Sequence, residues 1–157
     1  MNTAENIRVE FDCDDKDDID IKRLDELVRS VCVGFGVLDV EAQVSIVDDA
    51  RMIHLHRQFL NENTSTDVMS FDLSDDFESG RSFHIVVNLE QARRQAQKRR
   101  HGTICELALY ITHGLLHQFG YDDNQPAAAR AMHKKEDAIL QAGGFGVIYH
   151  KHPKFQK

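Results

Sequence analysis

The order of strand-like and helix-like segments constrains the fold of this chain more than any other feature. Four short runs are rich in β-branched or aromatic residues and are bounded by polar ones, a pattern typical of strands. They cover residues 7–11, 42–48, 67–73 and 83–88. Five longer segments repeat apolar residues every three or four positions, which predicts amphipathic helices. They cover residues 21–36, 49–61, 89–100, 103–119 and 127–143. This order predicts an α+β fold, a small mixed sheet of about four strands packed with about five helices.

The chain shows no internal repeat and no segment that resembles a linker. It has 157 residues, of which 41% are hydrophobic and only 2 are proline. This length is close to the usual size of one domain and is sufficient for a sizeable core. We therefore expect residues 1–157 to form a single domain.

The same composition excludes several classes of protein. No apolar run approaches the roughly 20 residues needed to span a membrane. The N-terminal stretch "MNTAENIRVEF" lacks the basic and apolar regions of a signal peptide, so the expected location is cytoplasmic. Three scattered cysteines without a CxxC pair indicate reduced thiols. A net charge of −7 argues against binding nucleic acid by overall charge alone, although a local basic patch remains compatible with it.

The stretch "THGLLHQFGYDDN" (112–124) carries the strongest chemical signal. His113 and His117 lie four residues apart on the predicted helix 103–119, so both imidazoles can reach one metal ion. Gly120 suits the left-handed position that ends a helix, after which the chain can return with Asp122 or Asp123 beneath the histidines. Two histidines and one carboxylate leave a fourth position open for water, as in catalytic zinc sites. The alternative is a helix that simply ends in an acidic turn.

The motif also resembles the signature of a known family. "HGLLHQFGYDD" is similar to the histidine-glycine-x-leucine-histidine run, followed by glycine-tyrosine-aspartate-histidine, of the YbeY-type rRNA maturation endoribonucleases. The segments "LNENTSTDVMSF", "HIVVNLEQARRQA" and "ELALYITHG" resemble the corresponding parts of that family. The resemblance covers roughly residues 42 to 145.

This resemblance implies a zinc-dependent, single-strand-specific endoribonuclease that acts on ribosomal RNA during maturation and assembly of the small ribosomal subunit. It implies one Zn²⁺ per chain, held by His113, His117 and Asp123, where Asp123 stands at the position of the family's third histidine. A carboxylate oxygen binds zinc at a distance similar to an imidazole nitrogen. Gly114 occupies the position of the general-base glutamate in HExxH peptidases, so peptidase activity is poorly supported.

The residues that handle the proton are not indicated by the sequence. The loop "ENTSTD" is shorter than in the family and lacks its arginine, and Phe83 and His84 replace a glycine-aspartate pair. Arg57, Glu106 and Asp122 are the candidates for a catalytic role, although Asp122 also suits a brace of the turn. An alternative function is therefore a non-catalytic ribosome-assembly or RNA-binding protein that retains the fold.

A basic segment precedes the histidine helix and is a candidate RNA contact. Its members are Arg93, Arg94, Lys98, Arg99 and Arg100. Cations near a helix C-terminus are also favourable without any ligand. Because the segment leads directly into the helix of the histidines, we expect it to contact RNA phosphates.

Overall fold

The computed structural model describes residues 5–13, 18–75 and 80–146. The strands are β1 (Asn6–Cys13), β2 (Asp39–Val47), β3 (Val68–Asp72) and β4 (Arg81–Asn88). The helices are α1 (Ile21–Gly34), α2 (Asp49–Leu60), α3 (Leu89–Arg99), α4 (Thr103–Gln118) and α5 (Pro126–Ala142). The predicted α+β class and the order of the elements are confirmed, with ends that differ by a few residues.

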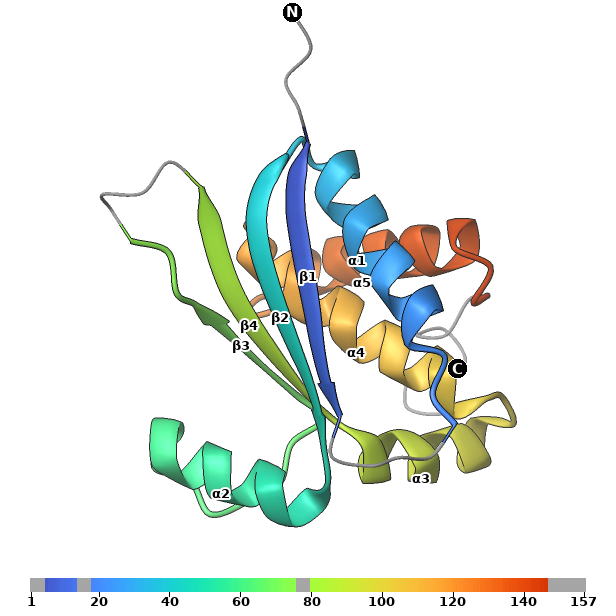
Figure 1. Ribbon diagram of the computed structural model, residues 1–157. Coiled ribbons are helices and arrows are strands. Elements are labelled where there is room, and N and C mark those ends of the chain that lie inside the picture. Colours follow the sequence, from blue (N-terminus) through green and yellow to red (C-terminus); the bar gives the residue numbers. More distant parts are fainter. Residues whose placement is uncertain (1–4, 14–17, 76–79, 147–157) are drawn as a thin grey trace, which may run out of the picture.

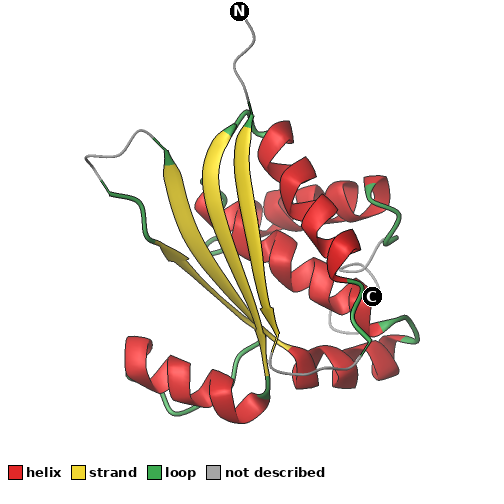
Figure 2. Cartoon of the chain, viewed as in Figure 1, coloured by secondary structure: helices red, strands yellow, loops and turns green. Residues whose placement is uncertain are grey.

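The four strands form one mixed sheet in the order β1-β2-β4-β3 (Figures 1 and 2). β2 runs parallel to β1 and to β4, whereas β3 pairs with β4 in the antiparallel direction. The parallel pairs are joined by helical connections, as parallel strands require. β3 and β4 follow one another along the chain and form the antiparallel pair.

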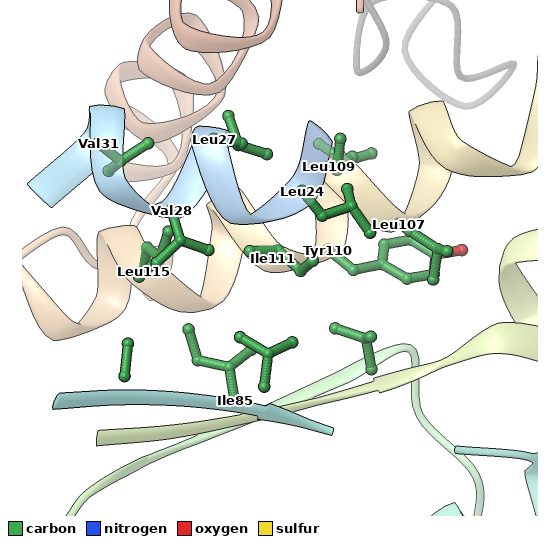
Figure 3. Close-up of a cluster of buried hydrophobic side chains, with 14 of the residues drawn as sticks. Leu24, Leu27, Val28, Val31, Ile85, Leu107, Leu109, Tyr110, Ile111 and Leu115 are labelled. Atoms are coloured by element: carbon green, nitrogen blue, oxygen red, sulfur yellow. The ribbon is translucent and has the colours of Figure 1, made fainter. Parts of the chain in front are cut away.

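The helices divide between the two faces of the sheet. α1, α4 and α5 lie on one side and α2 lies on the other (Figure 1). The larger core lies on the first side, where apolar residues of α1 and α4 meet above Ile85 of β4 (Figure 3). A smaller core joins α2 to the opposite face through Met52, Met69 and Val86. α4 is therefore an inner helix, and its polar residues lie against protein as well as solvent.

Local sequence explains where the helices begin. The side chains of Asp20, Asp48 and Asn88 each accept a hydrogen bond from a backbone N–H in the first turn of α1, α2 and α3. Such caps satisfy donors that the helix itself leaves unpaired. α5 begins at Pro126, the position at which a missing N–H costs nothing. Within the described ranges, none of the helices combines the length and apolar character that a membrane span requires.

Gly114 sets how closely α4 approaches the sheet. A Cβ atom at this position would lie 3.0 Å from Cγ2 of Ile85 and 3.4 Å from Cγ2 of Val68. The Ser70 hydroxyl of β3 also donates to the Gly114 carbonyl over 3.0 Å. The absence of a side chain thus lets α4 lie directly on β3 and β4, and this contact fixes the position of the two histidines that flank Gly114.

Candidate metal centre

Three side chains converge at the C-terminal end of α4. The Nε2 atoms of His113 and His117 are 3.1 Å apart. Carboxylate oxygens of Asp123 lie 3.6 Å from Nε2 of His113 and 3.9 Å from Nε2 of His117. One ligand atom from each residue lies within 4.8 Å of the other two, so this group could hold a metal ion.

These separations fit a tetrahedral site. With metal–ligand distances of about 2.0–2.2 Å, two ligands of a tetrahedral zinc ion stand roughly 3.3 Å apart. The three observed separations lie close to this value, and small side-chain adjustments suffice to reach it. Asp123 and His117 remain partly exposed, with side-chain exposed fractions of 39% and 33%. Three protein ligands and a solvent-facing side are the arrangement of a catalytic rather than a structural metal site.

The turn after α4 presents Asp123 to the histidines. Gly120 has a φ of 96°, the left-handed conformation that the sequence predicted for it. The Tyr121 N–H donates a hydrogen bond of 2.9 Å to the Leu116 carbonyl, and this bond closes the C-terminal end of the helix. Asp122 accepts hydrogen bonds from the backbone N–H groups of Asp123 and Asn124 at 2.7 and 3.2 Å. Asp122 therefore braces the turn, and the carboxylate of Asp123 lies beside both histidines.

Glu136 of α5 orients His113, and the sequence analysis missed it. Its carboxylate lies 2.9 Å from Nδ1 of His113 and 2.5 Å from Nδ1 of His133. An ionised carboxylate only accepts, so Nδ1 of His113 must carry the hydrogen. The lone pair of His113 then lies on Nε2, the atom that faces His117 and Asp123. A carboxylate that holds the far nitrogen of a metal-binding histidine is a recurrent feature of metal sites.

Electrostatics agree with this arrangement. Burial raises the pKa of Glu136, but hydrogen bonds and charge from His113 and His133 outweigh it and leave the pKa below its ordinary value. Burial lowers the pKa of His113, and the hydrogen bond with Glu136 together with nearby carboxylates reverses this, so the net shift is upward. Glu136 is thus held as a carboxylate, and its negative charge favours a positive charge on or beside His113.

The structure corrects two expectations about charged residues near α4. Glu106 is fully buried. Its carboxylate accepts hydrogen bonds from Nη1 of Arg99 at 2.7 and 3.0 Å and from Nε2 of His101 at 2.8 Å. The side chain of Arg99 is only 5% exposed. Arg99 is therefore an internal partner of Glu106 and not an RNA contact, since it cannot reach a phosphate without leaving a buried carboxylate unpaired. Glu106 joins α3 to α4 rather than serving the three ligands.

The remaining basic residues of α3 differ in their ion pairs and in their exposure to solvent. Arg94 forms an ion pair with Asp49 over 2.7 Å, and Arg93 is half-buried. Lys98 and Arg100 are exposed at the C-terminal end of the helix. This end adjoins the start of α4, roughly 15 Å along the helix axis from His113. Of the predicted RNA contacts, Arg94, Lys98 and Arg100 are exposed, and Arg94 is also paired with Asp49.

Arg57 is not brought together with the three ligands. It is exposed on α2, which packs on the face of the sheet opposite α4. Within the described residues, no side-chain hydrogen bond or ion pair joins Arg57 to His113, His117 or Asp123. The structure thus brings His113, His117 and Asp123 together but does not add Arg57 or Glu106 to this group.

Comparison with known proteins gives a consistent match. The model of the family described as Endoribonuclease YbeY matches residues 10–144. The chain is 36% identical over 124 residues to the Endoribonuclease YbeY of Anaeromyxobacter sp. (strain Fw109-5), which covers 78% of this chain and 65% of that protein. It is 33% identical over 132 residues to the Endoribonuclease YbeY of Carboxydothermus hydrogenoformans, covering 83% of this chain and 92% of that protein. The match spans slightly less than two thirds of the length of the relatives from Anaeromyxobacter sp. and Anaeromyxobacter dehalogenans, 65% and 64% respectively.

A solved structure shares the fold. The solution structure of a protein from Thermotoga maritima superposes with a TM-score of 0.57 and covers 87% of this chain and 90% of its own. The two sequences are 22% identical, so this likeness concerns the arrangement of helices and strands alone.

Proposed function

This chain belongs to the Endoribonuclease YbeY family, and from that premise we propose that it is a metal-dependent endoribonuclease. Its substrate is single-stranded ribosomal RNA during maturation and assembly of the small ribosomal subunit, and its metal is zinc, one ion per chain. The observation that carries the proposal is the convergence of His113, His117 and Asp123 around one point with a solvent-facing side.

The donor set supports zinc. Two imidazoles and one carboxylate are typical zinc ligands, and the separations between the donor atoms suit a tetrahedral ion. When bound, zinc activates water or polarises a phosphate oxygen and stabilises the charge that develops during hydrolysis. A hydrolytic site of this kind requires no nucleophile from the protein itself.

The chain's own residues hold the ligands in place. Glu136 keeps the hydrogen of His113 on Nδ1 and leaves Nε2 for the metal. The side chain of Asp122 accepts a hydrogen bond from the backbone N–H of Asp123, and this contact holds the turn that carries Asp123. Gly114 keeps α4 against the sheet and stands where a peptidase would carry its general base. The glycine argues against peptide hydrolysis of the HExxH type.

A second candidate is a non-catalytic RNA-binding or ribosome-assembly protein that retains the fold and the metal. The positions of the three candidate catalytic residues favour it. Glu106 is engaged in a buried ion pair, Asp122 is engaged in the turn, and Arg57 lies on α2 across the sheet. None of these three candidates stands beside the metal ligands as a free acid, base or phosphate clamp.

A cleavage assay separates the two candidates. Zinc-loaded protein is incubated with an end-labelled, single-stranded fragment of small-subunit ribosomal RNA, and with a duplex of the same sequence. The nuclease cleaves the single strand, spares the duplex, and loses activity to the background rate in His113→Ala and after chelation. Intact RNA in the presence of bound zinc and measurable RNA binding would favour the non-catalytic protein.

A further inference from the structure

A cluster of aromatic rings lies next to the turn that presents Asp123. Phe35 follows α1, and Phe119 and Tyr121 belong to the turn after α4. The ring centroids of Phe35 and Phe119 are 5.1 Å apart, and those of Phe35 and Tyr121 are 6.0 Å apart. All three residues are half-buried rather than enclosed. Tyr121 precedes Asp123 by two residues, so its Cα lies within about 7 Å of that ligand's Cα.

Two cations border these rings. Nζ of Lys135 lies 5.3 Å from the centroid of Phe35, and Cζ of Arg81 lies 5.4 Å from the centroid of Phe119. Lys135 immediately precedes Glu136, the residue that orients His113. The same helix therefore fixes the distance between the metal ligands and the cation over Phe35.

Phe35 and Lys135 also line one end of a groove between α1 and α5. The groove has a volume of about 390 Å³. Its other end holds Arg23, whose guanidinium carbon lies 4.0 Å from the ring centroid of Phe145, and Glu26 and Ser30 add polar atoms along its wall. Pockets of this volume are large enough for a small organic ligand.

We propose that the α1–α5 groove binds an unpaired base of the RNA substrate, stacked against Phe35, with Lys135 and Arg23 contacting the phosphates on either side. The assignment rests on the proposed function and names a subsite for the same substrate. Aromatic platforms combined with positive charge are the usual means by which proteins bind single strands. Glu26 accepts hydrogen bonds only, so it suits an N–H donor of a base, such as N3–H of uracil, and not a phosphate.

This subsite gives a physical reason for single-strand specificity. A base in a duplex is stacked between its neighbours and paired with its partner, and extruding it costs a few kcal/mol. An unpaired base enters the groove without that cost. The metal centre contributes no such selection, because phosphates are present in both forms.

Binding of a hexauridylate by the full chain tests the proposal, with fluorescence anisotropy as the readout and EDTA present to prevent cleavage. Phe35→Leu retains an apolar side chain but removes the ring, and we expect about tenfold weaker binding. Lys135→Gln should lower the slope of log affinity against log salt by about 0.7. The matched controls are Phe59→Leu, an aromatic residue that is 57% exposed on α2, and Lys134→Gln, an exposed neighbour on α5. Both controls should bind like the parent.

Two comparisons decide the outcome. An abasic strand of the same length should bind equally well to the parent and to Phe35→Leu, because it has no base to stack. A hexauridylate that carries 4-thiouridine should crosslink under light to the segment that contains Phe35 or Tyr121. Equal hexauridylate binding by Phe35→Leu, Lys135→Gln and the parent, or crosslinks confined to other segments, would overturn the subsite. Cleavage by the parent is scored separately, so loss of the subsite and failure of the nuclease proposal give different results.

Discussion

At the scale of single residues, the identity of the third ligand is the sharpest question. Asp123 has its carboxylate beside both histidines, whereas Asp122 is engaged with backbone N–H groups of the turn. We predict that Asp123→Ala weakens zinc binding by more than the ~10–100-fold typical when a residue that only orients a ligand is lost. Asp122→Asn should stay within that range, and Asp123→His should keep or strengthen binding. Competition with a chromogenic chelator measures these three variants and Asp122→Ala; if Asp122→Ala loses zinc while Asp123→Ala retains it, the ligand is Asp122.

Glu136 provides a second prediction at this scale. Glu136→Gln removes the charge that holds the proton on Nδ1 of His113, so zinc affinity should fall about 10–100-fold while the fold is retained. The control is Glu41→Gln, which changes an exposed carboxylate paired with Arg8 on the opposite part of the sheet. The same chelator competition applies. A Glu136→Gln protein with the zinc affinity of the parent would show that the contact does not act on the metal site.

The residues differ in how far they could be predicted from sequence. His113, His117 and Gly120 were visible because a spacing of four and a helix-ending glycine are local features. Asp123 required the family resemblance, since the turn alone left two carboxylates open. Glu136 was missed because its partner lies 23 residues away. A signal did exist: Glu136 stands four residues after Met132 and four before Leu140, on the buried stripe of α5, where a charged residue needs a partner.

At the scale of elements, the buried pair between Arg99 and Glu106 joins α3 to α4. Breaking such a pair typically costs about 3–5 kcal/mol because the remaining charge stays buried. We therefore predict that Glu106→Gln lowers the free energy of unfolding by roughly this amount in urea titrations, with zinc affinity unchanged. The double variant Arg99→Met with Glu106→Leu should recover most of the loss. A Glu106→Gln protein as stable as the parent would mean that the pair contributes little.

The same element explains the incorrect assignment of Arg99 to RNA binding. The segment 89–100 contains a cluster of basic residues, and composition alone does not assign each residue to a face. Leu89, Ala92 and Ala96 are the buried residues of α3, and Arg99 continues their spacing of three and four. Helical periodicity thus places Arg99 on the inner face, and its partner Glu106 lies on a different helix. The strands and helices were predicted well because each has its own apolar period, whereas the pairing between helices has none.

At the scale of the whole molecule, one larger core connects the sheet to α1 and α4, and α2 covers the other face of the same sheet. We expect the chain to unfold in a single cooperative step, as a single domain does. Urea curves recorded by far-ultraviolet and near-ultraviolet circular dichroism should coincide. Two separated transitions would show that part of the chain forms an independent unit.

The proposed function depends above all on a metal ion held by His113, His117 and Asp123. Crystals of the protein grown with one equivalent of zinc, with anomalous diffraction data collected at the zinc absorption edge, test this most directly. We predict one anomalous peak per chain, about 2.0–2.2 Å from Nε2 of His113, from Nε2 of His117 and from a carboxylate oxygen of Asp123. A peak held by other residues, or no peak between these three side chains at full zinc occupancy in solution, would contradict the metal centre described here.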